Sequence, residues 1–584
     1  MLVLLARCMG APLGEAVAED FDFLRRVLLS GMGSLADGGG SSAFWRPLAH
    51  QVYYAALGSL ILDHPRIVAL VHAVLLAAGA VLVCRALRPH LGGAAACVAS
   101  TFPMLAESTR TLVGWPSQFV DVGLYFFTAV ALYATARGRL ALALGSTLLA
   151  LFCKELAVIP ALLLPWFPDA RPRATRRRWA IAFAVLLAAW GAAYLAVRET
   201  AHLRLPHGLE EGAPAATLLQ RLAWAFGGSL RAIASLARAP AQEDGLALAL
   251  GLGLALAIAA TLALVPAARG RLRARRAWLA WGGAWYVAGT LALAPIFPLW
   301  QPNRVHFGSA GFGIAVAAAA EAAHPAIALG LVLSRGALLA LAPPAASVIT
   351  EAPPQTGAFM DFAQLSRLQR FMALTRRALR TGYPVAEHHA SVVEMNLPHG
   401  LIYALGGDHA VQVWYRDTTV RMVNFTRLAR DSALAMVAGV QFQPDASVQI
   451  VLLSPDAMRT QDLAYRHLLA HRWEAALAAL DRADALEPDT LHRVFRGNNA
   501  GYRAVALLNL DRMAEAEAQA RRSVSLDDTD PNGLRTLATV LALRGRYDDA
   551  LAEADRLLSL DPNEPSVLRL RESILHARAA ARGN

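Results

Sequence analysis

The sequence carries little charge for its length. Of its 584 residues, only 17% are Asp, Glu, Lys or Arg and 56% are hydrophobic, whereas an average soluble domain carries about 25% charged residues. The mean hydropathy is +0.39. This composition excludes a single ordinary water-soluble domain, and the chain is too long for one domain.

Cysteine is also scarce, and no pair of cysteines has CxxC spacing. The four cysteines are Cys8, Cys84, Cys97 and Cys153. All four precede residue 349, so the C-terminal part must be stable without disulfides. Their spacing indicates neither a disulfide framework nor a zinc site. No cofactor is indicated, and the absence of a clear ligand cluster leaves a role for a divalent metal open.

Acidic residues are too few to balance arginine, and the net charge is +11. The arginines cluster in short stretches between apolar runs, notably at Arg171–Arg178 and Arg269–Arg276. Short Arg-rich loops between spans stay cytoplasmic. The pattern therefore predicts a membrane orientation and no nucleic-acid partner. A composition bias of a GC-rich genome is the alternative source of the arginines.

Apolar runs are abundant, and many are long enough to cross a bilayer, which takes roughly 20 residues. They lie between residues 66 and 349 and predict a polytopic helix bundle with about eleven spans. Residues 1–14 are short for a span. We interpret them as a truncated first crossing, with a signal-like segment or a half-buried helix as alternatives.

The arginine clusters give these spans one consistent orientation. The loops at Arg85–Arg88, Arg137–Arg139, Arg171–Arg178 and Arg269–Arg276 fall on the cytoplasmic side. The segments expected outside are 14–65, 107–117, 198–244, 295–305 and everything after residue 349. We therefore expect an integral membrane protein, in a bacterial inner membrane, with an extracytoplasmic (periplasmic) C-terminal domain and the lipid bilayer as partner.

After residue 349 the sequence changes to a water-soluble pattern. Residues 350–357 indicate a linker, and 361–382 have apolar residues at helical spacing. Short strand-like runs follow at 391–395, 410–415 and 448–453. A helix followed by short strands suggests a small α/β module at 350–457. It has no phosphate-binding glycine loop, and the sequence does not indicate its function.

The last part, 458–584, contains an internal repeat that resembles tetratricopeptide repeats. Similar segments begin at Arg472, Arg512 and Arg546, and the last two are 34 residues apart (546 − 512), the tetratricopeptide period. The first two are 40 apart (512 − 472), which predicts an inserted loop around the LHRVFR segment at 491–496. The small position where paired helices touch is held by Ala476, Ala516 and Ala550.

Stacked helical pairs of this kind leave a concave face for a partner, so we expect the repeats to bind a protein or peptide. A rigid spacer or a dimerisation element is the alternative. The predicted fold class is mainly α. A polytopic membrane bundle (1–349) is followed by the small α/β module (350–457) and an α-solenoid of repeats (458–584).

Charged residues recur beside the spans, in the loops expected outside. They are Glu19, Asp20 and Asp22 after the first crossing, Arg46 before the second span, Glu107 four residues after Pro103, and Arg304 and His306 at the mouth of a late span. Lys154 and Glu155 are adjacent within an apolar stretch. Ionisable residues at membrane depth are costly, so this pair is a functional candidate. A paired structural charge is the alternative.

In their order and spacing over about residues 15–315, these pieces resemble the polytopic C-type (GT-C) glycosyltransferases. The closest likeness is to the transmembrane-and-TPR O-mannosyltransferase type. It rests on an acidic pair (Glu19–Asp20 or Asp20–Asp22), Arg46-Pro47-Leu48, Val71-His72, Pro103 with Glu107, Lys154-Glu155, and NRVHFGSAGF with Arg304, Ser309 and Gly311. The acidic pair departs from Asp-Asp, and Phe102 stands where the family has histidine.

The resemblance implies inverting sugar transfer from a polyprenyl-phosphate donor to an acceptor hydroxyl, with a protein acceptor favoured by the repeats. Asp20, with Asp22 second, would be the general base. Arg304 would steady the phosphate leaving group, and Lys154 would add a second positive charge. The remaining implied substrate-binding residues are Glu19, Arg46, Glu107, Glu155 and His306.

A protein of another class fits the same sequence. In this alternative the transferase fold has lost activity, and the chain is a membrane-anchored repeat scaffold for envelope protein assembly. Wide separation of Asp20 and Asp22 from Arg304 would favour the scaffold. A transporter or flippase is the weaker reading, because such proteins show internal duplication of spans and this sequence shows none.

Overall fold

The computed structural model describes residues 2–106, 108–204, 217–234, 245–296, 301–341, 360–395, 402–424, 437–442, 448–487, 493–560 and 564–583. They are mostly helical and form two compact units. The first unit is Met1–Ser347 with Ala352–Arg370, and the second is Val348–Glu351 with Phe371–Asn584. The linker predicted at 350–357 lies outside the described residues.

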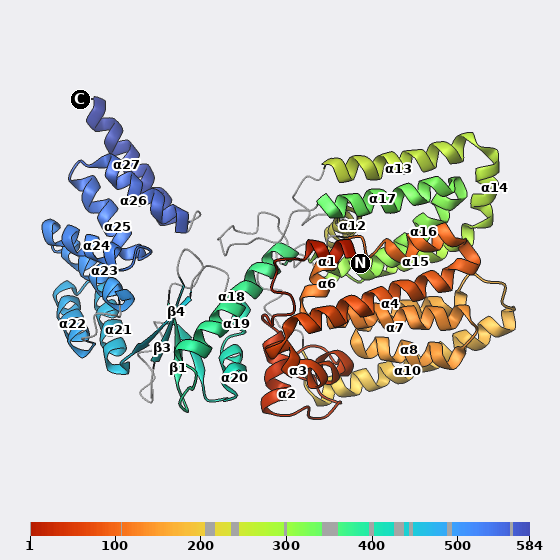
Figure 1. Cartoon of the computed structure of the whole chain (residues 1–584), viewed down its shortest axis with the longest axis horizontal. Helices are drawn as coiled ribbons and strands as arrows, with labels where there is room; N and C mark the ends of the chain where they lie inside the picture. The colour runs from red at the N-terminus through yellow and green to blue at the C-terminus, as the bar shows by residue number, and fades with distance from the viewer. Residues whose placement is uncertain are drawn as a thin grey trace. The chain divides into compact units, whose positions relative to one another are not determined.

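In the first unit, apolar helices run side by side (Figure 1). They are α4 (Pro65–Leu91), α5 (Gly93–Thr101), α7 (Phe119–Ala136), α8 (Leu140–Cys153), α9 (Val158–Leu163), α10 (Arg173–Thr200), α12 (Leu218–Ala234), α13 (Gly245–Leu264), α15 (Arg276–Leu291), α16 (His306–Ala323) and α17 (Pro325–Leu341). Small residues allow close packing between them. A Cβ on Gly282 of α15 would lie 2.7 Å from the Gly311 carbonyl oxygen of α16.

Four helical segments of the described residues are long and apolar enough to cross a membrane: Pro65–Leu91, Pro116–Ala136, Arg173–Thr200 and Pro302–Ala323. A fifth span is possible if the bent pair Ala255–Leu264 and Pro266–Ala274 counts as one. Shorter apolar helices lie at Leu140–Cys153, Glu155–Trp166 and Pro325–Ala337. A membrane protein is therefore supported, while the number of about eleven spans stays a prediction.

Short elements gather at one end of this bundle, which we call the site end. They are α1 (Leu2–Arg7), α2 (Asp20–Leu29), η1 (Pro47–Val52), α3 (Tyr53–Asp63), α6 (Thr109–Gly114), η2 (Pro116–Gln118), η3 (Glu155–Ala157) and η6 (Pro302–Val305). Helix α4 begins at this end, at Pro65, and α7 also begins here, directly after η2. The end therefore consists of the segments that join the spans.

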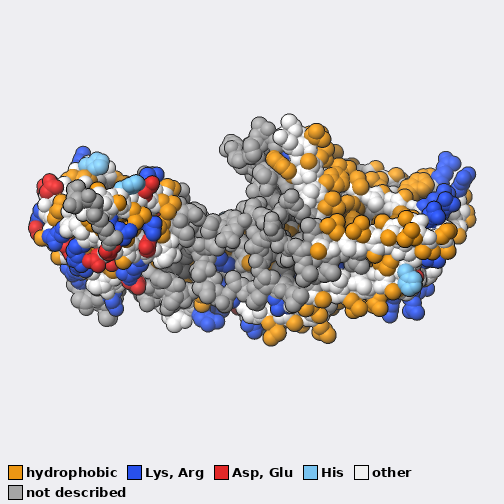
Figure 2. Space-filling view, turned by 90° about the horizontal axis from the view of Figure 1, so that it is seen from above, with side chains coloured by type: hydrophobic (Ala, Val, Ile, Leu, Met, Phe, Trp, Pro, Cys, Tyr) orange, Lys and Arg blue, Asp and Glu red, His pale blue; other side chains and the backbone are white. Residues whose placement is uncertain are grey.

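The opposite end, which we call the Arg-rich end, holds the turns at residues 85–91, 137–139, 169–178 and 266–276. Arg271 donates hydrogen bonds to the carbonyls of Ala322 and Ala323, and Arg275 donates one to that of His90. Helix α14 (Pro266–Ala274) turns by 109° from residues 255–264 and lies across this end (Figure 1). Arginine side chains project there beyond a largely apolar surface (Figure 2).

The helix predicted at 361–382 is confirmed as α18 (Phe362–Gly382). The longer part of the second unit begins within it, at Phe371. Four strands follow: β1 (Ser391–Met395), β2 (Arg421–Asn424), β3 (Val437–Phe442) and β4 (Val448–Leu453). The sheet order is β2-β1-β3-β4; β1 is parallel to β2 and β3, and β4 is antiparallel to β3. The strands predicted at 391–395 and 448–453 are confirmed.

The strand predicted at 410–415 is wrong, because these residues form helix α20 (His409–Tyr415). Ala410, Val411 and Val413 are fully buried on this short helix. Arg416 ends the helix in the left-handed conformation, with φ of +56°. Over so few residues, an apolar run with alternating valines does not separate a strand from a buried helix, and packing decides.

Three helical pairs and a final helix form the repeats: α21 (Pro455–Leu469) with α22 (Trp473–Leu486), α23 (Arg493–Asn509) with α24 (Met513–Leu526), α25 (Pro531–Leu543) with α26 (Tyr547–Leu560), and α27 (Pro565–Gly583). Ala476, Ala516 and Ala550 are all 0% exposed, as the touching positions require. The predicted inserted loop is wrong for residues 493–496, which extend α23 to 17 residues against 13 in α25.

Candidate functional site

Asp20 begins α2 at the site end and is completely buried. Its Oδ1 accepts a hydrogen bond from the Tyr54 hydroxyl at 2.6 Å. Its Oδ2 accepts from the Val17 backbone N–H at 2.8 Å and from the Trp115 indole at 3.1 Å. Burial outweighs these donors and raises the pKa of Asp20 to about 8, with the neighbouring Glu19 charge adding to the rise. Asp20 is therefore mostly protonated at neutral pH and enclosed away from solvent.

Glu19 precedes Asp20 and is the partly exposed carboxylate of the pair. It accepts a hydrogen bond from the Ser117 hydroxyl at 3.2 Å. The next residue of η2, Gln118, accepts one from Asn303 of η6 at 2.6 Å. Polar contacts thus run from the first loop to the segment that carries Arg304. Asp22 lies two positions after Asp20 on α2, so the two side chains point to opposite sides of the helix.

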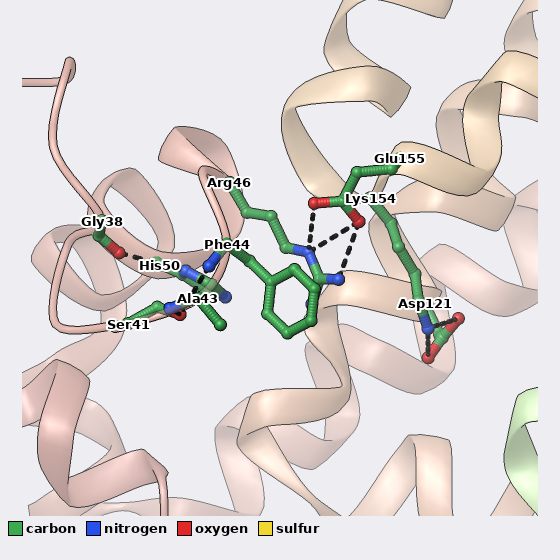
Figure 3. Close-up of polar contacts among 9 residues, drawn as sticks. All are labelled: Gly38, Ser41, Ala43, Phe44, Arg46, His50, Asp121, Lys154 and Glu155. Carbon is green, nitrogen blue, oxygen red and sulfur yellow. Dashed lines mark hydrogen bonds and ion pairs between the residues drawn. The ribbon is translucent and has the colours of Figure 1, made fainter. Parts of the chain in front are cut away.

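Two ion pairs lie at the site end (Figure 3). Lys154 donates to both carboxylate oxygens of Asp121, at 2.6 and 2.7 Å. Arg46 binds Glu155 through Nε and Nη2, the latter at 2.7 Å, and its guanidinium stacks over the Phe44 ring. The pairs are neighbours, because Lys154 and Glu155 are adjacent and Arg46 is also attracted to Asp121. The Lys154 and Asp121 side chains are only 14% and 4% exposed.

Arg304 in η6 and His306, the first residue of α16, lie close to these pairs. The positive charge of Arg304 acts on Lys154, and the negative charge of Asp121 acts on His306. Arg304 is partly exposed, whereas His306 is buried at 2% exposure, with its ring against the edge of Tyr125. The structure therefore brings Arg304 to the charged cluster and encloses His306 within the helix packing.

Most of the predicted site residues meet at this end. Glu19, Asp20, Arg46, Lys154, Glu155, Arg304 and His306 belong to it, and Asp22 lies on the same helix as Asp20. Glu107 lies outside the described residues. Among the described residues, no group of three or more His, Cys, Asp or Glu side chains could hold a metal ion.

Sequence reasoning missed Asp121 and the loop Trp115–Gln118. Two signals could have found the Asp121–Lys154 pair. Asp121 is the only charged residue of the apolar segment 116–136, and Lys154 is the only lysine of the whole chain. A single lysine among 55 basic residues makes position 154 stand out, because lysine and arginine are not interchangeable at ion pairs.

His50 is a further buried group that the sequence did not single out. Its ring stacks on Phe23, with centroids 4.3 Å apart, and its Nδ1 lies 3.3 Å from the Gly38 carbonyl oxygen (Figure 3). Burial, and then the positive charge of Arg46, lower the pKa of His50 to about 3. The ring is therefore neutral at physiological pH and packs as an aromatic group.

No protein-family profile and no curated protein matches the chain. Among solved structures, ArnT from Cupriavidus metallidurans in the apo state is similar at 12% identity and a TM-score of 0.43, over 76% of this chain and 91% of that chain. The first TPR of Spaghetti (RPAP3) bound to an HSP90 peptide matches at 17% identity and a TM-score of 0.20, over 22% of this chain and 98% of that one.

The APC/C hetero-tetramer Cut9-Hcn1 gives 13% identity and a TM-score of 0.20, over 90% of this chain and 94% of that chain. At such low identities and TM-scores, these likenesses carry no functional argument.

Proposed function

We propose that the chain is an integral membrane glycosyltransferase. It transfers a sugar from a polyprenyl-phosphate donor to an acceptor hydroxyl, with inversion at the anomeric carbon. One observation carries the proposal: charged residues from five separate segments meet at one end of the helix bundle. These are Arg46, Asp121, the Lys154–Glu155 pair and Arg304, whose charges act on one another, and Glu19, which is bound by Ser117 of a neighbouring loop. Such a cluster at membrane depth is costly unless it is used.

The acidic pair of the first loop would supply the general base. A pair of carboxylates whose environments separate their pKa values divides the roles between them. The raised pKa of Asp20 keeps it protonated and anchored to Tyr54 and Trp115. Glu19, partly exposed and oriented by Ser117, would accept the hydroxyl proton as that oxygen attacks the anomeric carbon. This assignment replaces Asp20 and Asp22 as the bases suggested by the sequence.

The cations would hold the phosphate of the donor as it becomes the leaving group. Arg46 and Lys154 are paired with Glu155 and Asp121, and Arg304 adds a third positive charge that acts on Lys154. Arg304 is partly exposed, and we assign it to meet the phosphate. A guanidinium suits this role because its donors form a fixed fork.

The remaining parts of the proposal concern placement and partners. The Arg-rich end would face the cytoplasm, and the site end would face the periplasm of a bacterial inner membrane, where the donor's isoprenoid tail stays in the bilayer. The repeats would bind the protein acceptor or a partner protein on their concave face. Mannose is the donor sugar that the resemblance favours.

The test measures sugar transfer from radiolabelled polyprenyl-phosphate hexoses in membranes that contain wild type or a variant. We expect Glu19→Gln and Arg304→Ala to abolish most transfer, by about 100-fold or more. Asp20→Asn should keep most of it, because Asn is also neutral. Its amide oxygen can accept from Val17 and Trp115, while its amide nitrogen can donate to the Tyr54 hydroxyl oxygen. Arg139→Ala, an exposed arginine of the Arg-rich end, is the matched control for loss of charge.

Equal incorporation in wild type, all variants and empty membranes, with several donor sugars tried, would leave the inactive repeat scaffold as the better account. The closed ion pairs are the observation that favours this alternative. Arg46 and Lys154 already have carboxylate partners, as structural charges would.

A further inference from the structure

A buried glutamine far along the chain holds together the two segments that carry the acidic pair and its partners. Gln369 lies on the part of α18 that belongs to the first unit, and it is 0% exposed. Its Nε2 donates one hydrogen bond to the Glu15 carbonyl at 2.9 Å and another to the Gly114 carbonyl at 2.6 Å. These are separated from Gln369 by 354 and 255 residues in the sequence. One side-chain amide thus bridges two loops.

Both bridged carbonyls lie a few residues before groups of the site in the sequence. Glu15 lies four residues before Glu19 on the loop that leads into α2. Gly114 precedes Trp115, whose indole holds Asp20, and Ser117, whose hydroxyl holds Glu19. A shift at either carbonyl therefore moves the acidic pair relative to its hydrogen-bond partners.

The two loops and the helix fit closely at this point. The Gly14 N–H donates to the same Gly114 carbonyl at 2.8 Å. Gly14 has φ of +79°, and a Cβ there would lie 1.9 Å from the Pro65 carbonyl oxygen, so no other residue fits. A Cβ on Gly114 would lie 3.5 Å from Phe362 and 3.6 Å from Leu365 of α18. The helix packs directly against the backbone that its glutamine binds.

The orientation of the amide is fixed by these contacts. Two carbonyl oxygens face one end of the Gln369 side chain, so the nitrogen must lie there, because an oxygen would be repelled. The Oε1 atom, in contrast, is buried with no hydrogen-bond partner among the described residues. An unsatisfied buried oxygen costs about 1–3 kcal/mol. The position therefore keeps a polar donor despite that cost, whereas a leucine would fill the same space.

We propose that Gln369 is a positioning residue of the transferase site, which sets the geometry of the Glu19–Asp20 pair by clamping the loops before α2 and η2. The inference rests on the proposed function and assigns a part of it to α18. Gln369 does not touch the reacting groups, and it contacts none of the cations assigned to the phosphate. Its loss should therefore lower kcat and leave the KM for the lipid donor nearly unchanged.

The test compares Gln369→Leu, Gln369→Glu and Arg377→Ala in the full-length protein in membranes. Arg377 is exposed on the same helix, so its variant is the matched control. Gln369→Leu keeps the shape without the donor, and we expect kcat for sugar transfer to fall about 100-fold, the effect of a roughly 1 Å misplacement. Arg377→Ala should keep wild-type kcat.

Gln369→Glu provides a readout that a purely structural role would not give. A protonated glutamic acid donates to one carbonyl, whereas the ionised form presents only acceptors to both. The kcat of this variant, relative to wild type, should therefore rise as the pH is lowered. A Gln369→Leu variant that folds and turns over like Arg377→Ala, or a Gln369→Glu variant whose relative kcat does not change with pH, would overturn the proposal.

Hydrogen exchange, followed by mass spectrometry, separates this inference from the transferase itself. In Gln369→Leu, the peptides that contain residues 14–24 and 112–118 should exchange faster than in wild type, while those of α15 and α16 should not change. If wild type transfers no sugar, the proposed function fails and this measurement still decides the clamp. Unchanged exchange in residues 14–24 and 112–118 would rule the clamp out.

Discussion

The two ends of the membrane bundle use charge in opposite ways. At the site end, charges of both signs are buried or half-buried, and several are held in short contacts, such as Lys154 with Asp121. At the Arg-rich end, charges are mostly exposed and of one sign, and Arg137, Arg139, Arg177 and Arg178 project into solvent. Exposed arginines have a collective effect, because an excess of them in short loops sets the orientation of the chain in the membrane. Buried charges act through individual partners, so each one is costly to change.

The largest expected effect tests this difference at the Lys154–Asp121 pair. Lys154→Met leaves the Asp121 carboxylate, whose side chain is 4% exposed, without its partner. We expect the free energy of unfolding in detergent micelles to fall by about 3–5 kcal/mol. Asp121→Asn combined with Lys154→Met should recover most of that loss. If the single variant were as stable as wild type, the site end would not depend on paired charges.

The next effect concerns a partly buried ion pair at the Arg-rich end, between Asp169 and Arg171. Asp169 accepts a hydrogen bond from Arg171, whose guanidinium stacks over Trp179 at 4.6 Å. Asp169→Asn should lower the free energy of unfolding by about 1–3 kcal/mol, because two buried nitrogen atoms of Arg171 already lack partners. Chemical denaturation measures the change. If Asp169→Asn lowered the free energy of unfolding by less than an exposed arginine variant does, burial would not determine how much a lost ion pair destabilises this end.

A third prediction uses the pH dependence of Asp20. Its carboxyl ionises with an ordinary pKa of 3.8 and, in the folded protein, with a pKa raised to about 8 by burial. The wild type should therefore lose stability as the pH rises from about 4 to about 8, because only the unfolded state releases the proton in that range. Asp20→Asn does not ionise. Its melting temperature relative to wild type should thus rise with pH, by an amount that corresponds to at least about 1 kcal/mol.

Thermal melts at pH 5 and pH 8 check this prediction, with Asp22→Asn as the matched control, since Asp22 is partly exposed on the same helix. A difference between Asp20→Asn and wild type that is constant with pH would contradict the raised pKa. It would also restore Asp20 as a candidate for the base.

The smallest effect is expected for the exposed arginines. Arg139→Ala removes a side chain that lies in solvent after α7, and surface substitutions of this kind change stability by no more than about 0.5 kcal/mol. Denaturation of this variant beside Lys154→Met measures the comparison directly. A loss above about 1 kcal/mol would show that the Arg-rich end also depends on single charges.

The sequence predicted the elements of the fold far better than the contacts of the site. The apolar runs, the arginine clusters and the 34-residue offset between Arg512 and Arg546 are local patterns, and they gave the membrane bundle and the helical repeats. Where the local pattern was ambiguous, the predicted secondary structure was wrong. The valine-rich run at 410–415 became α20, and the extra residues before Arg512 lengthened α23 instead of forming a loop.

Candidate site residues could be named from the sequence because charge is rare in apolar segments. Their roles could not, because a role depends on exposure and on partners. Asp20 and Glu19 are neighbours in the chain, yet one is completely buried and the other is partly exposed. Asp121 and Gln369 were not singled out, although both hold groups of the site end.

By itself, the sequence determined which segments are apolar enough for the bilayer and which suit water. It also determined the positions of the repeats and the rarity of charges within the bundle. Hydrophobic content and periodicity are properties of a few neighbouring residues. Only the tertiary structure decided which charges pair. Lys154 meets Asp121 across 33 residues, Arg46 meets Glu155 across 109, and Asp20 receives the Trp115 indole across 95. Such partners are set by how the helices pack. A pattern of neighbouring residues does not reveal which distant residues come into contact.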